Sequence, residues 1–264
     1  MIPTTIRSEG LATRDRVSSA IQLAAVRTGV DFGYLLNQAK VESGLNPNAK
    51  ARTSSATGLF QFIEQTWLAT VKKHGDAHGL GWAANSIRRG ANGRYTVGDP
   101  QLRRQILDLR RQPEAASAMA GEFAADNREY LEGRLGRQVE GVDLYLAHFL
   151  GPAGAARFLK AHDSSPNASA AGILPAAAKA NRWVFYGKGG APRSFADIRD
   201  RFADKIGGGG LPAIAPRPGP AFPLDPSGLP EVRTADIDFN RDRPAGPSPQ
   251  YARLAYLMLA QLGG

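Results

Sequence analysis

The sequence predicts a mainly α-helical domain with a small β-hairpin element, followed by a Pro/Gly-rich tail and a short C-terminal helix. Apolar residues recur at helical spacing through most of residues 1–206. An Asn92-Gly93 turn separates two short stretches of mixed β propensity, and ten of the 18 prolines fall in the segment 211–249. The first observation predicts helices, the second a hairpin, and the third a segment that cannot bury enough apolar surface to order itself.

Two helices are expected at the start of the domain. Residues 14–28 carry apolar side chains at helical spacing, and Gly29 ends this helix. Asp31 is a candidate N-cap for the second helix, which Asn46-Pro47 stops because proline disfavours a helical residue before it. Glu42 is therefore expected at the C-terminal end of the second helix.

The rest of the domain alternates helices with loops and the hairpin. A third helix is expected near Glu64 with Trp67 facing inward, and the hairpin is expected within residues 87–97. Later helices are expected where the apolar periodicity resumes, several of them just after a proline. Their expected ranges are 102–110, 115–131, 142–150, 154–161, 182–186 and 195–206.

The chain divides into three parts by composition. We expect a folded domain over residues 1–206, with its core at about 15–206, and a linker or tail over 207–249 that begins with four glycines. Residues 250–264 form the expected short C-terminal helix. This apolar end is far too short to span a bilayer, so we expect it to dock on a protein partner.

Composition limits the classes of function. The formal charge of +9 favours polyanionic partners, among which nucleic acid, anionic lipid and cell wall all qualify. Nucleic acid is not expected, because the basic residues are scattered without interleaved aromatic side chains. The absence of cysteine excludes disulfides and thiol catalysis. We expect no cofactor and no metal, since the pair His74 and His78 has no evident acidic third ligand.

One acidic residue beside a hydroxyl, Glu42-Ser43, is followed after a polar loop by Gly58-Leu59-Phe60-Gln61. Cleavage of a glycosidic bond needs a carboxylic acid that stays protonated until the leaving oxygen takes its proton, which apolar surroundings favour. An ordinary helix-end glutamate is the alternative reading for an isolated residue, and the downstream residues argue against it. Glu42 is therefore the candidate catalytic acid.

The stretch from Val30 to Trp67 resembles the soluble lytic transglycosylase family, within the goose-lysozyme-like superfamily, whose signature is Glu-Ser followed by Gly-Leu-Met/Phe-Gln. The resemblance implies a lysozyme-like fold and cleavage of the β-1,4 bond between N-acetylmuramic acid and N-acetylglucosamine in peptidoglycan glycan strands. It further implies 1,6-anhydro-muramic products and a lone Glu42 acting first as acid and then as base. No convincing second carboxylate accompanies Glu42; Glu64, Asp76 and Asp99 lack a supporting pattern.

The candidate substrate-binding residues near the acid follow from the same motifs. Ser43 is a candidate to orient the carboxyl or bind a sugar substituent, with local helix capping as the alternative. Gly58 suits a close approach of the backbone, and Gln61 has an amide for a sugar N-acetyl group or for Glu42. Leu59 and Phe60 complete this wall, and we expect them to pack.

Two later motifs resemble the family less closely. Tyr145 and His148 lie in a segment ending Ala-His-Phe-Leu-Gly-Pro, which is similar to a subgroup among phage-associated and proteobacterial members. The family usually shows tyrosine and asparagine where His148 and Phe149 stand here. Asn181 and Tyr186 lie in the last motif, where the family has an aromatic hydroxyl near the acid. For all four candidates, packing, capping or an internally satisfied hydrogen bond is an equal alternative.

Three functions remain open from the sequence. The same fold and acid also suit a hydrolytic muramidase, and a noncatalytic cell-wall-binding assembly protein is a third reading. The substrate places the action in the periplasm or cell wall. Residues 1–10 have no signal-like apolar run and no stretch has the length of a membrane span, so we expect export by a specialised route or phage-type release.

Overall fold

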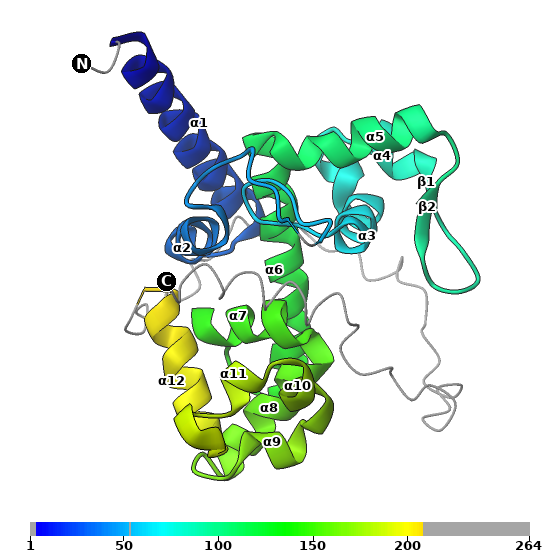
Figure 1. Cartoon of the computed structure of the whole chain (residues 1–264). Coiled ribbons are helices and arrows are strands. Elements are labelled where there is room, and N and C mark those ends of the chain that lie inside the picture. Colours follow the sequence, from blue (N-terminus) through cyan, green and yellow to red (C-terminus); the bar gives the residue numbers. More distant parts are fainter. Residues whose placement is uncertain (1–3, 53, 208–264) are drawn as a thin grey trace, which may run out of the picture.

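The computed structural model describes residues 4–52 and 54–207, which form a mainly helical domain with one two-stranded antiparallel sheet (Figure 1). The predicted fold class, a lysozyme-like mainly helical domain with a small hairpin, is confirmed. The expected tail after Gly207 and the expected C-terminal helix lie outside the described residues. In the part of the chain described, no helix is both long and apolar enough to cross a membrane.

Helices account for most elements. The α-helices are α1 (Thr4–Thr28), α2 (Phe32–Ser43), α3 (Glu64–His74), α4 (Gly81–Ser86), α5 (Pro100–Asp108), α6 (Pro113–Leu135), α7 (Gly141–Leu150), α8 (Pro152–Ser164), α9 (Ala170–Ile173), α10 (Pro175–Ala180), α11 (Arg182–Phe185) and α12 (Phe195–Lys205). Short 3-10 turns are η1 (Gly75–His78), η2 (Leu109–Arg111) and η3 (Lys188–Gly190), and the strands are β1 (Ile87–Arg89) and β2 (Tyr95–Val97).

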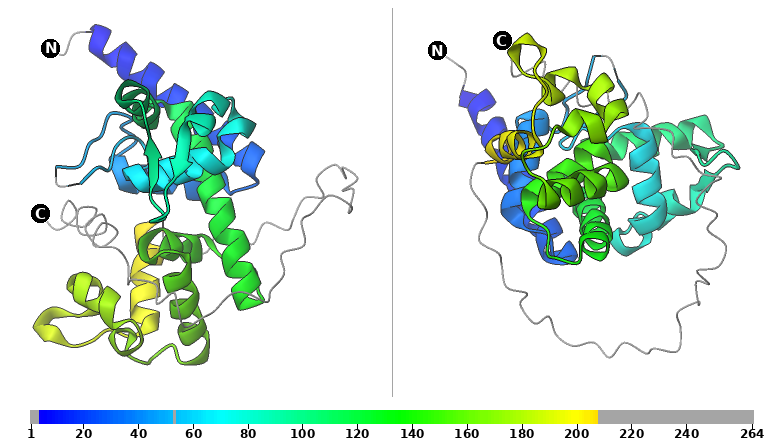
Figure 2. Two further views of the ribbon diagram at one scale, coloured as in Figure 1. Left: turned by 90° about the vertical axis from the view of Figure 1, so that its right-hand side faces the viewer. Right: turned by 90° about the horizontal axis from the view of Figure 1, so that it is seen from below.

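Helix α6 runs through the centre of the domain. It contacts α1 and α3 towards one end and α7 and α8 towards the other, so that it joins two lobes (Figures 1 and 2). The first lobe contains α2 to α5 and the hairpin, and the second contains α7 to α12. This arrangement brings the end of α2 from the first lobe against α7 from the second.

Small residues let α1 and α6 pack closely. Val17, Ile21 and Ala24 of α1 are buried, and the facing part of α6 is rich in alanine. A Cβ built on Gly121 of α6 would lie 2.7 Å from Thr28 Oγ1 of α1. The close contact between these two long helices therefore depends on the missing side chain at Gly121.

The local signals around α2 and the hairpin are confirmed. The Asp31 side chain accepts a hydrogen bond from the Tyr34 backbone N–H at 2.7 Å, and Gly44 ends α2 in the left-handed conformation, with φ +62°. The strands pair with Ile87 opposite Val97, and Gly93 in the turn has φ +76°. Glu42 thus lies in the last turn of α2, as predicted.

The sequence prediction was incomplete in two respects. Helix α1 begins ten residues earlier than the expected residue 14, at Thr4. The short helices α4, α9 and α10 were not predicted, because four to six residues are too few to show a helical period. The other helices and the hairpin differ from the predicted ranges mainly at their ends.

Candidate active site

Glu42 is buried at the junction of the two lobes, with 5% of its surface exposed. Its Oε1 lies 3.3 Å from His148 Nε2 of α7, within the range of an ion pair. Neither carboxylate oxygen has a hydrogen-bond partner among the described residues. The carboxyl group therefore lies close to the imidazole of His148 and accepts no hydrogen bond from the described residues.

Three side chains contact the imidazole of His148. Gln38 Nε2 lies 3.4 Å from His148 Nδ1, and the ring of Tyr145 stacks on the imidazole with centroids 5.9 Å apart. The rings of Phe123 of α6 and His148 are T-shaped to each other, with centroids 6.4 Å apart. These contacts orient the ring so that its Nε2 faces Glu42.

Two tyrosines share the environment of Glu42. Burial, followed by the negative charge of Glu42, raises the pKa of Tyr145 well above its usual value. The same two causes raise the pKa of Tyr34. Both phenols therefore remain neutral at physiological pH and keep a hydroxyl hydrogen to donate.

Tyr34 and Gln38 were missed by the sequence reasoning. They precede Glu42 by eight and four residues on α2, so helical spacing places all three on one face. This spacing was a usable signal, and all three residues are buried.

Gly58 allows a close backbone approach. Its φ is +85°, and a Cβ built on it would lie 1.8 Å from the carbonyl oxygen of Arg110. Its N–H donates to Ala49 O at 2.8 Å. Gly58 is therefore required by the contact between this loop and η2.

Ser43 and Gln61 bind the backbone in this structure. Ser43 Oγ lies 2.8 Å from Leu59 O and 3.1 Å from Ala39 O, so its hydroxyl joins the end of α2 to the loop. Gln61 is in the left-handed region at φ +47°, and its Nε2 donates to Gly58 O at 2.8 Å and to Ala49 O. Leu59 and Phe60 are buried in the core, where packing was expected.

Arg110 completes the support of this loop and was not singled out from the sequence. Its NH1 donates to Ser55 O at 2.7 Å and to Phe62 O at 3.0 Å, while Nε donates to Leu107 O. Burial lowers its pKa to about 10. No sequence signal distinguishes Arg110 from the other arginines of the chain.

Asn181 and Tyr186 make local contacts. Asn181 is buried, and its Nδ2 donates to Ala177 O at 3.0 Å. The guanidinium of Arg182 lies over the Tyr186 ring, 4.7 Å from its centroid, and Tyr186 forms an isolated backbone bridge with Pro192. The contacts shown for Tyr186 thus lie within its own segment. The charge of Glu42 contributes to the raised pKa of Tyr34 and of Tyr145.

Of the three other carboxylates weighed from the sequence, Glu64 and Asp99 have structural partners, and Asp76 lies in η1. Glu64 pairs with Arg103, and Asp99 caps α5 by accepting from Gln101 N at 2.7 Å. Glu122 and Asp126 of α6 form ion pairs with His74 and His78. Within residues 4–52 and 54–207, no group of three or more histidine and acidic side chains is arranged to hold a metal ion.

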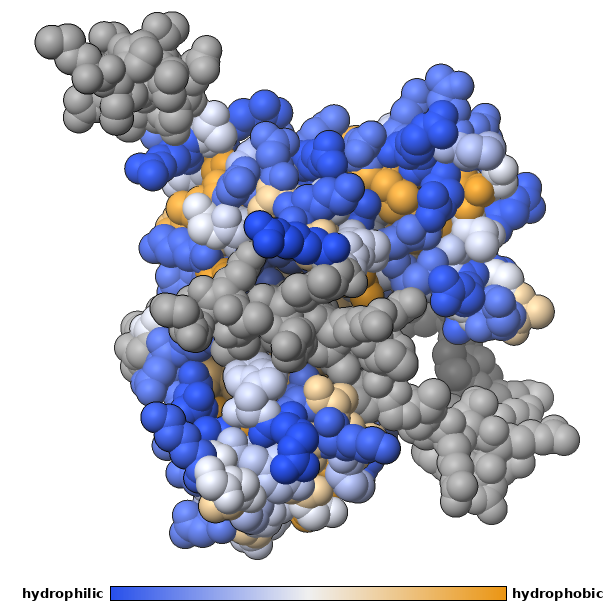
Figure 3. Space-filling view, in the orientation of Figure 1, coloured by the Kyte–Doolittle hydropathy of each residue, from blue (hydrophilic) through white to orange (hydrophobic). Residues whose placement is uncertain are grey.

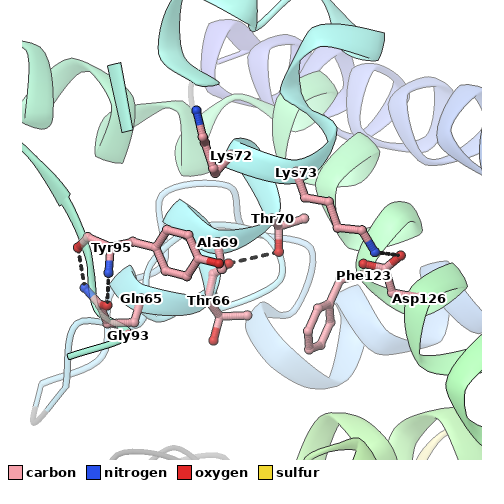
Figure 4. Close-up of a pocket in the computed structure, with 10 residues that line it drawn as sticks. All are labelled: Gln65, Thr66, Ala69, Thr70, Lys72, Lys73, Gly93, Tyr95, Phe123 and Asp126. Atoms are coloured by element: carbon pink, nitrogen blue, oxygen red, sulfur yellow. Dashed lines mark hydrogen bonds and ion pairs between the residues drawn. The ribbon is translucent and has the colours of Figure 1, made fainter. Parts of the chain in front are cut away.

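A cavity of about 430 Å³ opens between α3, the hairpin and α6 (Figure 4). We call it the hairpin pocket; it is lined by Gln65, Thr66, Ala69, Thr70, Lys72, Lys73, Gly93, Tyr95, Phe123 and Asp126. Lys73 pairs with Asp126 at 2.8 Å across one side. Phe123 belongs both to this pocket and to the surroundings of His148, so the pocket lies next to the acid site.

The fold and the site together define a mainly helical, lysozyme-like domain in which a buried acid, Glu42, lies in the last turn of α2. The comparison with known families agrees with this class: residues 19–91 match the family described as the transglycosylase SLT domain. The matched segment includes Glu42-Ser43 and the loop from Gly58 to Gln61, and it ends before His148. At the level of the family, the match supports cleavage of cell-wall peptidoglycan of the lytic transglycosylase type.

Proposed function

We propose that this protein is a peptidoglycan lytic transglycosylase in which Glu42 is the catalytic acid and base. The observation that carries the proposal is the buried carboxyl of Glu42 at the end of α2, facing His148 and lying inside the segment that matches the family. Glu64 and Asp99, two of the three alternatives weighed, are engaged elsewhere. A single carboxyl suits a reaction that needs no activated water.

The proposed reaction has two proton transfers through Glu42. The protonated carboxyl gives its proton to the oxygen between muramic acid C1 and the next sugar, and the C1–O bond breaks with its electron pair on that oxygen. The muramyl C6 hydroxyl oxygen then attacks C1, and its proton passes to the Glu42 carboxylate. The product carries a 1,6-anhydro bond, and Glu42 returns to its starting state.

The residues around Glu42 have distinct proposed roles. We assign His148, oriented by Gln38 and Tyr145, to line the cleft at the acid. Ser43 joins the loop to the end of α2 and thereby helps to hold the acid, while Gly58 and Gln61 fix the conformation of the loop and its contact with η2. Asn181 and Tyr186 keep only their sequence-based assignment as substrate-binding candidates.

The hairpin pocket is the proposed site for neighbouring sugars of the glycan strand. It combines the aromatic side chains of Tyr95 and Phe123 with the polar side chains of Gln65 and Thr70. Such a mixture of apolar surface and a few polar groups is typical of ligand pockets. The contact between Phe123, which lines the pocket, and His148 supports this assignment.

Digestion of purified peptidoglycan tests the proposed function. We expect the wild-type protein to release muropeptides with anhydro-muramic ends, and Glu42→Gln to lose at least about 100-fold of this rate, because the amide has no proton to give. Mass spectrometry of the products is the measurement. Glu129→Gln, at an exposed position of α6, is the matched control and should digest at the wild-type rate.

The digest also separates the alternatives. Products that carry only reducing ends would show a hydrolytic muramidase instead of a transglycosylase. Glu42→Gln digesting as fast as the wild type would leave the noncatalytic, wall-binding reading. Because the proposed substrate is cell-wall peptidoglycan, we place the action in the periplasm or cell wall, reached by a specialised route or phage-type release, and we assign the segment after Gly207 to a protein partner.

A further inference from the structure

Lys205, the last residue of α12, places its ammonium beside an aromatic ring of the acid site. Its Nζ is buried and has no hydrogen-bond partner among the described residues. The ammonium lies over the Tyr145 ring, 5.6 Å from its centroid, and Tyr145 stacks on His148 beside Glu42. A buried ammonium without an ionic or hydrogen-bond partner is costly.

The end of α12 is held against both α2 and α7. A Cβ built on Gly207 would lie 2.7 Å from Asn37 Nδ2 of α2, and Phe202 packs on Tyr145 and Phe149 of α7. Lys205 lies between these two contacts in sequence. Its position is therefore determined by the packing of three helices.

Groups of two elements connect Lys205 with the acid. Tyr145 of α7 lies under the Lys205 ammonium and stacks on His148, and the charge of Glu42 on α2 acts on Lys205. Burial lowers the pKa of Lys205 to about 8, while the charge of Glu42 acts in the opposite direction. The ammonium is therefore charged at neutral pH, and Glu42 is the acid whose field reaches it.

We propose that Lys205 is a positioning residue for the acid, whose ammonium stabilises the Glu42 carboxylate during the interval between the two proton transfers. In that interval Glu42 has given its proton to the leaving oxygen and has not yet taken the proton of the C6 hydroxyl. A fixed positive charge nearby favours this form without exchanging a proton itself. Lys205 lies well beyond the segment 19–91 that matches the family.

The proposed role of Lys205 rests on the proposed function, because a cation near Glu42 affects catalysis only if Glu42 is the acid. The test is the pH profile of muropeptide release at limiting substrate for Lys205→Met and Lys205→Arg. Without the cation, Glu42 holds its proton to higher pH, so the alkaline limb for Lys205→Met should move up by about 1 pH unit. Lys205→Arg keeps the charge, and its limb should stay near that of the wild type.

Lys160→Met is the matched control, since Lys160 is an exposed lysine of α8. Its alkaline limb should not move. If Lys205→Met fails to fold by circular dichroism, Lys205→Gln replaces it. If the folded variant is inactive, ¹³C NMR titration of the Glu42 carboxyl is the readout, and its midpoint should rise.

An alkaline limb or titration midpoint that stays at the wild-type position in the folded, neutral variant would overturn the role of Lys205. Glu42→Gln distinguishes this failure from that of the proposed function. If Glu42→Gln is inactive while Lys205→Met keeps the wild-type profile, only the role of Lys205 is lost. If Glu42→Gln is fully active, the proposed function is lost as well.

Discussion

At the scale of single residues, the Gly58 to Gln61 segment is held by contacts with backbone atoms. Gly58 lets the loop approach Arg110, and the Gln61 amide and Ser43 hydroxyl bind carbonyl oxygens. The sequence predicted that this motif binds substrate. In the structure, its backbone is joined to the end of α2 through the bond from Ser43 to Leu59 O. Few other residues could adopt the backbone conformation of Gly58 or make the amide hydrogen bonds of Gln61.

Gly58→Ala tests the close contact between Gly58 and Arg110. The new Cβ would lie 1.8 Å from Arg110 O at a residue whose φ is +85°, so we expect a loss of about 2–4 kcal/mol in the free energy of unfolding. Urea denaturation followed by circular dichroism measures it. Gly98→Ala is the control, because nothing lies within 4 Å of a Cβ there and its φ is ordinary. Equal midpoints for the two variants would contradict the proposed constraint.

At the scale of elements, the contact between α1 and α6 sets the centre of the domain. Gly121 faces Thr28 in this contact, whereas Gly133, on the same helix, is exposed with open space around it. The two glycines have the same local conformation and different surroundings. They therefore separate helix propensity from packing between helices.

Gly121→Ala and Gly133→Ala should change stability in opposite directions. At Gly133 alanine improves helix propensity by up to about 1 kcal/mol. At Gly121 the added methyl group collides with Thr28, and overpacking should cost a net of about 1–3 kcal/mol. The shift in thermal midpoint of each variant is the measurement. A stabilised Gly121→Ala would show that α1 moves away easily, against the close packing described here.

At the scale of the whole molecule, two lobes meet around α6 and place residues from distant parts of the chain at one acid. Hydrophilic residues cover most of the face shown in Figure 3, on both lobes. The formal charge of +9 adds a general attraction to an anionic wall. We therefore expect the affinity for the wall to have a component that does not depend on the acid site.

The variant Glu42→Gln, which we expect to be inactive, isolates this component. Its sedimentation with purified sacculi should fall several-fold between low salt and about 1 M salt, where the Debye length shrinks to about 3 Å. The basic charge gives the direction of this change. Sedimentation that does not change with salt would show that attachment depends on the glycan contacts alone.

Much of the fold was predictable because its signals are local. The caps at Asp31 and Gly44, the Asn92-Gly93 turn and the apolar periodicity each act over a few residues. Helices α4, α9 and α10 were missed because they are shorter than two turns. The start of α1 was placed too late because its first ten residues lack a clear apolar face.

The sequence by itself determined the mainly helical class, the position of Glu42 at a helix end and the family that its motif resembles. Only the tertiary structure decided which groups meet near that acid: His148 lies 3.3 Å from Glu42, Tyr145 stacks on His148, and Lys205 from the last described helix lies over the Tyr145 ring. Helix caps and apolar periodicity depend only on residues that are neighbours in the sequence. The surroundings of a buried carboxyl depend on which helices pack together, and here they are brought from three helices by the closure of two lobes around α6.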